Sequence, residues 1–217
     1  MNYRMNVQAK IEFAPVQGAE AWIELVDWYG RPAIRKQRVP KAYRIELLDQ
    51  ILRTRRTKEE VEILHHAKLA GVKCPEVFFA DPSSSEIIMN FINGPLLKDI
   101  DGGRNIAYEI LGKYAGMLHS KGIIHGDLTT KNVVVSGSDI FLLDFGLSFY
   151  SDRLEDRADD LHLLKQVLKS SQTLRKATAN FDLALKGYAS ILGRKEVSSI
   201  KKQIGKIELR GRYAQVD

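Results

Sequence analysis

Three oxygen-bearing side chains in the second half of the chain have the types and the order that phosphate chemistry requires. The stretch HGDLTTKN places Asp127 five positions before Asn132, and FLLDFG puts Asp144 at the end of an apolar run. A carboxylate can orient or deprotonate a hydroxyl group, while an amide oxygen and a second carboxylate suit the oxygen coordination of Mg²⁺. The pattern predicts phosphoryl transfer, with Asp127 as the base, Asn132 and Asp144 as Mg²⁺ ligands, and His125 bracing the loop.

Such a site also needs a lysine that binds the nucleotide phosphates. The segment PAIRKQ offers Lys36 at the end of an expected strand, although Arg35 stands beside it. An acid on the following helix would pair with this lysine, and Glu59, Glu60 and Glu62 all compete for that role. A surface lysine in a basic run is the alternative interpretation of Lys36.

A loop that covers the phosphates is expected ahead of the lysine. The segment VQGAEA at 16–21 stands in that place, with Gly18 as its single glycine. It therefore departs from the G-x-G-x-x-G pattern, and by itself it predicts no nucleotide site.

The elements that would position these residues change in type along the chain. Alternating apolar residues and turn signals predict strands over 10–16, 21–27 and 32–37 and a hairpin over 76–92. Helical spacing predicts two helices between 42 and 71, joined near Arg56 and Thr57.

The second half is predicted to be mainly helical. After a helix over 105–122 come a loop and two short apolar strands, and then helices over 156–171, 174–193 and 196–209. This order predicts an α+β protein of two lobes with a cleft between them. Residues 1–90 would form a strand-rich nucleotide-binding lobe, and residues 91–217 a helical catalytic lobe with a basic tail.

Composition argues against a disulfide-bonded, membrane-spanning or secreted protein. The 217 residues include one cysteine, Cys74, which excludes an internal disulfide and is interpreted as a small core residue. No apolar run approaches the length of a membrane span, and the amino terminus lacks the apolar block of a signal peptide. A cytoplasmic protein without a membrane partner is expected.

The net charge of +6 is concentrated in two basic blocks. Residues 31–58 hold ten Lys and Arg against two acids, and residues 193–217 hold seven against three. Such blocks favour an anionic partner, with nucleic acid first among the candidates. Solvated lysines that maintain solubility are the equally weighted alternative.

Taken together, these motifs resemble a known family. HGDLTTKN is similar to the catalytic loop of protein kinases, and DFG is similar to their metal-binding motif. Over nearly its whole length the chain resembles the small RIO-type atypical kinase of the KEOPS (EKC) tRNA-modification complex, in a minimal, archaeal-like form. The matching segments are QGAEA at 17–21, RVPKAYR at 38–44, RRTKEE at 55–60, HGDLTTKN, LLDFGLS at 142–148, EDRADDL at 155–161 and LRGR at 209–212.

The resemblance implies ATP and Mg²⁺ as cofactors and assigns roles to particular residues. It selects Lys36 for the phosphates and Glu60 as its helix partner, and it carries over the roles of base and metal ligands in the two later motifs. It also implies that Gly18 and Glu20 lie at the nucleotide entrance. The backbone from Met89 to Phe91 would meet the adenine, with Asn90 where many members of the family have an acid.

The resemblance also implies a function. The family supports formation of threonylcarbamoyladenosine at position 37 of tRNA, while a partner subunit performs the transfer. The kinase-like subunit binds this transferase and a small accessory subunit, and it hydrolyses ATP or phosphorylates Ser/Thr residues. The two basic blocks, 31–58 and 193–217, would then bind tRNA phosphates.

Two departures from ordinary protein kinases bear on the rival hypotheses. Gly126 stands where those kinases have an Arg that binds an activation-loop phosphate, and no proline follows Pro95, which excludes an Ala-Pro-Glu motif. Both disfavour a free-standing Ser/Thr protein kinase. The intact site residues disfavour a non-catalytic scaffold of kinase shape. The short segment after DFG disfavours a small-molecule kinase.

Overall fold

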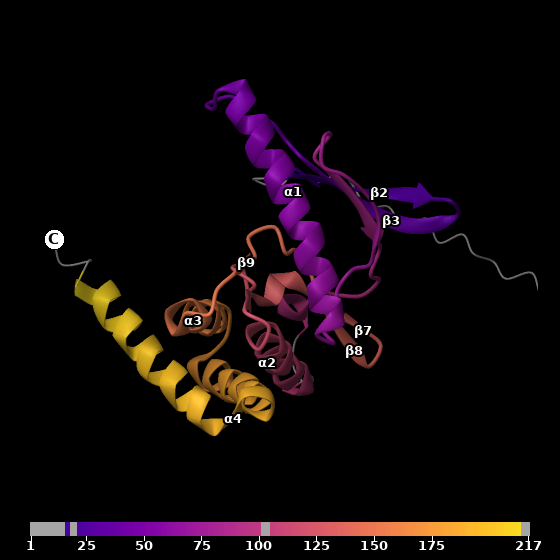
Figure 1. Ribbon diagram of the computed structural model, residues 1–217. Helices are drawn as coiled ribbons and strands as arrows, with labels where there is room; N and C mark the ends of the chain where they lie inside the picture. The colour runs from indigo at the N-terminus through magenta and orange to yellow at the C-terminus, as the bar shows by residue number, and fades with distance from the viewer. Residues whose placement is uncertain (1–15, 18–20, 101–104, 214–217) are drawn as a thin grey trace, which may run out of the picture.

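A computed structural model describes residues 16–17, 21–100 and 105–213 of the chain. Figure 1 shows a sheet crossed by one long helix in the first half of the chain, and a group of helices in the second half. The strand predicted at 10–16 lies outside the described residues except for Val16. Gly18 and Glu20 also lie outside them.

The sheet has five strands in the order β1-β2-β3-β5-β4, and each neighbouring pair is antiparallel. The strands are β1 (Val16–Gln17), β2 (Ala21–Trp28), β3 (Arg31–Arg38), β4 (Val77–Asp81) and β5 (Glu86–Asn90). The predictions of strands over 21–27 and 32–37 and of a later hairpin are confirmed. In the pairing of β3 with β5, Lys36 lies opposite Ile87 and Arg35 opposite Ile88, so successive side chains point to opposite faces of the sheet.

The helix α1 (Glu46–Leu69) runs without interruption through Arg56 and Thr57. The prediction of two helices joined there is wrong. No Gly or Pro interrupts this stretch, and the buried Thr57 hydroxyl donates to the carbonyl oxygen of Arg53 at 2.8 Å. The polar middle of the helix therefore stays helical, and its last half buries Ile63, Leu64 and Ala67.

Three α-helices and a short 3₁₀ segment that precedes them form most of the second part of the molecule. They are the short 3₁₀ segment η1 (Leu97–Asp99) and the helices α2 (Asn105–His119), α3 (Leu154–Ser171) and α4 (Leu174–Tyr213). Gly193, with φ of 84°, divides α4 into two helices, so the prediction of three helices after residue 150 is confirmed. Within the described residues, no helix is long and apolar enough to cross a membrane.

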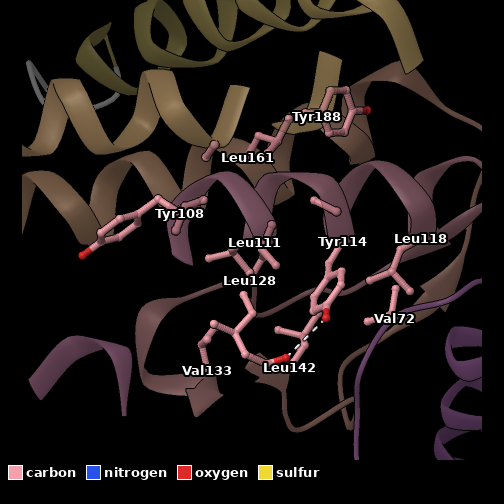
Figure 2. Packing of buried hydrophobic residues seen from close by; sticks show 14 of the residues in the cluster. Val72, Tyr108, Leu111, Tyr114, Leu118, Leu128, Val133, Leu142, Leu161 and Tyr188 are labelled. Atoms are coloured by element: carbon pink, nitrogen blue, oxygen red, sulfur yellow. Dashed lines mark hydrogen bonds between the residues drawn. The ribbon is translucent and has the colours of Figure 1, made fainter. Parts of the chain in front are cut away.

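The main core lies around α2. Figure 2 shows Leu111 and Tyr114 of α2 between Leu161 and Tyr188 on one side and Leu142 on the other. The helices α2 and α4 cross very closely, because Gly112 and Gly187 leave room at the crossing. A Cβ at either glycine would overlap a backbone carbonyl of the other helix.

Short antiparallel pairs hold the two loops that carry the predicted chemistry. The hairpin of β7 (Val133–Ser136) and β8 (Asp139–Leu142) separates them, and β6 (Ile123–Ile124) pairs with β9 (Phe149–Tyr150). The first loop, with the 3₁₀ segment η2 (Thr130–Asn132), joins β6 to β7, and the second joins β8 to β9. Both loops therefore start and end on paired strands, which fixes where their side chains lie.

Candidate active site

A cavity of about 420 Å³ is lined by residues of the sheet, α1 and the β7–β8 hairpin. This volume is within the usual range for small-molecule sites. Most of the lining side chains are apolar, and five are polar. The polar ones are Lys36, Glu60, Asn90, Asn132 and Asp144.

Lys36 extends from β3 into this cavity and joins two carboxylates. Its Nζ atom lies 2.6 Å from Oε1 of Glu60 and 2.7 Å from Oδ1 of Asp144. Among the three competing acids, Glu60 is the partner, while Glu59 pairs with Arg55. The structure thus brings together three residues that lie far apart in the sequence.

Charge and burial act against each other at this lysine. Burial alone would lower the pKa of Lys36, but the carboxylates of Glu60 and Asp144 raise it above its ordinary value. Burial would raise the pKa of Asp144, and the ammonium of Lys36 instead holds it below its ordinary value. Lys36 and Asp144 are therefore both ionised at neutral pH, which holds a cation inside the cavity.

Arg35 points to the other face of the sheet. Its guanidinium binds Glu86 at 2.6 Å and Glu24 at 3.0 Å. The ambiguity between Arg35 and Lys36 is thus decided by the alternation of side chains along β3.

Arg38 is a member of this site that the sequence predictions missed. Its Nη2 atom lies 2.6 Å from Oε2 of Glu60, so that each oxygen of this carboxylate binds one cation. Both side chains are almost fully buried. A strand places residues two apart on the same face, so the spacing of Lys36 and Arg38 was an available signal.

The loop between β6 and β7 joins Asp127 to Asn132. The amide nitrogen of Asn132 donates to the backbone oxygen of Asp127 at 2.9 Å and to its Oδ2 at 2.8 Å. The five-position spacing thus lets the Asn132 side chain hydrogen-bond back to Asp127, so that the loop closes on itself. Lys131, another residue that the sequence predictions missed, lies 3.1 Å from the same Oδ2 through its Nζ.

Asp144 has an unusual backbone. Its φ of 55° is rare for a residue with a side chain, and such strain is found most often at functional sites. The N–H of Gly146 donates to its Oδ1 at 3.2 Å. The strained turn directs the carboxylate toward Lys36, as the contact between the two shows.

The predicted metal ligands, Asn132 and Asp144, fit Mg²⁺ by their chemistry. Both line the cavity, and because the hydrogen bonds of the Asn132 amide to Asp127 use its nitrogen, its oxygen could serve as a ligand. Among the described residues, no group of three or more His, Cys, Asp or Glu could hold a metal ion. A site with two protein oxygens suits Mg²⁺, which keeps waters and substrate phosphates in its shell, better than Zn²⁺.

Asp160 of α3 holds the first loop in place. Its carboxylate accepts the backbone N–H of His125 at 2.7 Å and that of Gly126 at 2.8 Å, and it meets Nε2 of His119 at 3.2 Å. The sequence predictions gave it no role beyond the motif EDRADDL. The available signal was its place four residues before the buried Leu164, on the apolar stripe of the helix.

His125 is fully buried and braces both loops. Its Nδ1 accepts the N–H of Asp127 at 3.2 Å, which leaves Nε2 to donate to the carbonyl oxygen of Leu143 at 3.1 Å. This pattern requires the neutral ring, and burial lowers the pKa of His125 below its ordinary value.

Gly126, which replaces the arginine of ordinary kinases, has a structural reason to be glycine. Its φ is 77°, and a Cβ there would overlap the carbonyl oxygen of Leu147. A side chain at this position would therefore push the two loops apart.

The predicted adenine-facing segment, Met89 to Phe91, lines the same cavity. The side-chain oxygen of Asn90 accepts the N–H of Glu76 at 2.6 Å, so it braces the neighbouring backbone.

The chain is similar to a known protein family and to two archaeal proteins of nearly the same length. The family model described as the RIO domain matches residues 35–169. The KEOPS complex subunit Bud32 of Pyrococcus abyssi is 38% identical over 211 residues, which cover 92% of this chain and 95% of that protein. A probable serine/threonine-protein kinase BUD32 homolog of Archaeoglobus fulgidus is 37% identical, with coverage of 91% and 95%.

A longer archaeal protein and a solved structure of low sequence identity are also similar to this chain. A probable bifunctional tRNA threonylcarbamoyladenosine biosynthesis protein of Methanothermobacter thermautotrophicus is 40% identical over 95% of this chain, which spans only 38% of that protein. A crystal structure of the Rio2 kinase of Chaetomium thermophilum, in an ADP/Mg²⁺-phosphoaspartate complex, is 14% identical with a TM-score of 0.64. The match covers 91% of this chain and 70% of the Rio2 chain. At this low identity it supports the fold alone. The chain therefore belongs to the RIO-domain family, in the group of the KEOPS subunit Bud32, and has the α+β fold of a minimal two-lobed kinase.

Proposed function

We propose that this protein is an Mg²⁺-ATP-dependent phosphotransferase or ATPase subunit of a KEOPS complex, in which it supports threonylcarbamoyladenosine formation at position 37 of tRNA. The observation that carries the proposal is the contact of Lys36 with both Glu60 and Asp144 at one cavity. The names of the archaeal relatives support the biological setting. Residues 1–90 are assigned to the nucleotide-binding lobe and 91–217 to the catalytic lobe.

The geometry supports a division of roles in nucleotide binding. The adenine enters between the apolar side chains of the cavity, beside the backbone from Met89 to Phe91. Lys36 binds phosphate oxygens, and Glu60 keeps the lysine in place. Asn132 and Asp144 hold Mg²⁺, which neutralises phosphate charge when it is bound.

Asp127 is assigned to the reacting hydroxyl group. Its carboxylate orients the acceptor and takes up the proton as the acceptor oxygen bonds to the terminal phosphorus. The bond from that phosphorus to the bridging oxygen breaks, and ADP leaves with the electron pair. Lys131, beside Asp127, is placed to offset the negative charge of the transferred group.

Water or a Ser/Thr hydroxyl would serve as the acceptor. Gly126 stands in a tight turn where ordinary kinases have the arginine that binds an activation-loop phosphate. The sequence after Pro95 also lacks an Ala-Pro-Glu motif. Both features favour hydrolysis inside an assembly over phosphorylation by a free-standing protein kinase.

The proposed partners are the transferase subunit, a small accessory subunit and tRNA. The second half of α4 supports the tRNA contact, because Lys201, Lys202 and Lys206 are exposed while Ile200 and Ile204 are buried. Basic residues of the block 31–58 would add phosphate contacts.

The deciding experiment is Mg²⁺-dependent ATP hydrolysis by the wild type and by Asp127→Ala, each alone and with the transferase subunit plus tRNA. Turnover that rises with the partners and falls with the substitution supports an ATPase that works inside the complex. Turnover that ignores the partners, with phosphate appearing on added proteins, supports an independent kinase instead. A protein that binds no nucleotide would be a scaffold.

A further inference from the structure

A tyrosine of the last helix, Tyr188, lies fully buried where α4 crosses α2. The neighbouring Gly187 holds the α4 backbone against α2, because a Cβ there would overlap the carbonyl oxygen of Glu109. The backbone of Tyr188 also passes close to Gly116 of α2, where a Cβ would lie 3.3 Å from the Tyr188 carbonyl oxygen. The close crossing therefore fixes the backbone of Tyr188, and the surrounding core fixes its ring.

The hydroxyl group of Tyr188 meets a histidine that is also buried. It lies 3.0 Å from Nδ1 of His119, and the two rings are packed edge to face with their centres 5.5 Å apart. The other ring nitrogen, Nε2, lies 3.2 Å from Oδ2 of Asp160. Since an ionised carboxylate only accepts hydrogen bonds, Nε2 donates to Asp160, and in the neutral ring Nδ1 then accepts the O–H of Tyr188. This tautomer satisfies both contacts.

Asp160 joins this pair to the loop between β6 and β7. Its Oδ2 accepts the N–H of His125 at 2.7 Å, and its Oδ1 accepts the N–H of Gly126 at 2.8 Å. Asp127, the proposed base, follows directly. A continuous series of hydrogen bonds therefore connects a residue of the last helix to the loop that carries Asp127.

We propose that Tyr188 is a positioning residue for Asp127, and that it acts through His119 and Asp160. Donation from Tyr188 fixes the tautomer and the plane of the His119 ring, so that Nε2–H points at the carboxylate. The carboxylate, held in this way, fixes the two backbone N–H groups that precede Asp127. The effect on catalysis rests on the proposed function of Asp127, whereas the series of hydrogen bonds does not. A tyrosine that only fills the core would affect stability without affecting this loop.

The first measurement follows the ring nitrogens of His119 and the backbone amide of Gly126 in ¹⁵N–¹H spectra of the full chain. Tyr188→Phe keeps the aromatic ring and removes only the hydroxyl group. We expect the signals of both residues to move, because Nδ1 loses its donor and the hydrogen bonds beyond it change with it.

Tyr108→Phe is the matched control for this measurement. Tyr108 lies on α2, is nearly buried in the same core, and accepts a hydrogen bond from Gln172 at 2.9 Å through its hydroxyl oxygen. The substitution therefore removes a buried tyrosine hydroxyl that does not belong to the series. It should leave the signals of His119 and Gly126 in place.

The second measurement separates turnover from nucleotide binding. With the proposed ATPase, Tyr188→Phe should lower kcat by about three- to tenfold and leave KM for Mg²⁺-ATP within about twofold, since one neutral hydrogen bond is lost and the groups that bind the nucleotide are unchanged. Tyr108→Phe should change neither constant. An equal loss of kcat in both variants would indicate a general loosening of the core and overturn the proposal.

The double variant Tyr188→Phe, His119→Gln tests whether Tyr188 acts through His119. His119→Gln alone should move the Gly126 amide, and the added Tyr188→Phe should move it no further. An unmoved Gly126 amide in Tyr188→Phe, or an effect of Tyr188→Phe that persists in full without His119, would overturn the proposal. If His119→Gln does not fold, the contrast of Tyr188→Phe with Tyr108→Phe decides alone. A moved amide without ATP turnover in any of the proteins would support the positioning of the loop and count against the proposed ATPase.

Discussion

Glu60 binds one cation through each of its oxygens, and this is the central interaction of the site at the scale of single residues. Lys36 and Arg38 share its charge within a buried environment, where an unpaired charge is strongly unfavourable. Arg38 therefore compensates part of the charge of Glu60, which does not depend on Lys36 alone for its neutralisation.

Replacing Arg38 should thus affect stability as well as nucleotide binding. Arg38→Gln leaves Glu60 with one cation, and we expect a loss of about 3–5 kcal/mol in the free energy of unfolding, measured with urea. Arg38→Lys should recover part of that loss. The exposed pair of Arg55 and Glu59 provides the comparison, since Arg55→Gln should leave the urea midpoint unchanged. Equal midpoints for Arg38→Gln and the wild type would contradict the interpretation.

The two aspartates of the site should separate binding from chemistry. Asp127→Ala should still bind Mg²⁺-ADP and lower turnover by about 10²-fold or more, because it removes the group that positions the acceptor. Asp144→Ala should weaken Mg²⁺-ADP binding as well, since it removes a proposed metal ligand. Calorimetry of ADP with and without Mg²⁺, together with steady-state rates, measures both effects. Near-normal turnover in both variants would refute the assignment.

At the scale of elements, the crossing of α2 with α4 holds the helical part together. The two backbones approach so closely that a methyl group at Gly187 would overlap the carbonyl oxygen of Glu109. Moving the helices apart would also disturb the packing around Leu111 and Tyr188 (Figure 2).

Gly187→Ala should therefore destabilise the fold by about 1–3 kcal/mol or more, although alanine is the better helix former. Gly205→Ala is the matched control on the same helix, because nothing lies within 4 Å of a Cβ at Gly205. It should raise the stability by about 0.4–1 kcal/mol. Thermal unfolding of both variants tests the pair, and a shift of the same sign in both would exclude a special role for the crossing.

Much of this arrangement could be predicted from local patterns. The strands and most of the helices followed from alternation and helical spacing. The long polar middle of α1 was misread as a break, because polarity alone does not end a helix that contains neither Gly nor Pro.

Two of the missed residues, Asp160 and Arg38, share one physical reason. Asp160 meets the backbone of His125, which lies 35 positions earlier, and Arg38 meets Glu60, which lies 22 positions later. Such contacts depend on how distant elements pack, and a local pattern does not contain that information. The choice of Lys36 over Arg35 likewise depended on which face of the sheet turns toward the cavity.

At the scale of the whole molecule, the buried His125 and the half-buried His162 make stability depend on pH. Burial lowers the pKa values of His125 and His162 below the ordinary value of 6.5. Below about pH 6.5 both histidines therefore bind protons in the unfolded chain more readily than in the folded protein. Stability should be fully present above that pH and should decline as the pH falls, by up to about 1.4 kcal/mol per pH unit for the buried His125 and by less for His162, whose charge solvent screens.

Urea unfolding at pH 7.5, 6.5 and 5.5 measures this slope. In His162→Gln the dependence between pH 6.5 and 5.5 should shrink but persist, because the two hydrogen bonds of His125 require its neutral form. A midpoint that does not change over this range in either protein would contradict the assignment.

The carboxylate of Asp160 has a consequence for the timescale on which the site opens. Because the amide hydrogens of His125 and Gly126 both point at a buried oxygen pair on α3, they are shielded although they belong to a loop. Their exchange with deuterated solvent should then be as slow as that of the helical core around Leu161, rather than that of a surface turn. The segment at the centre of the proposed chemistry would thus be among the last parts of the chain to open.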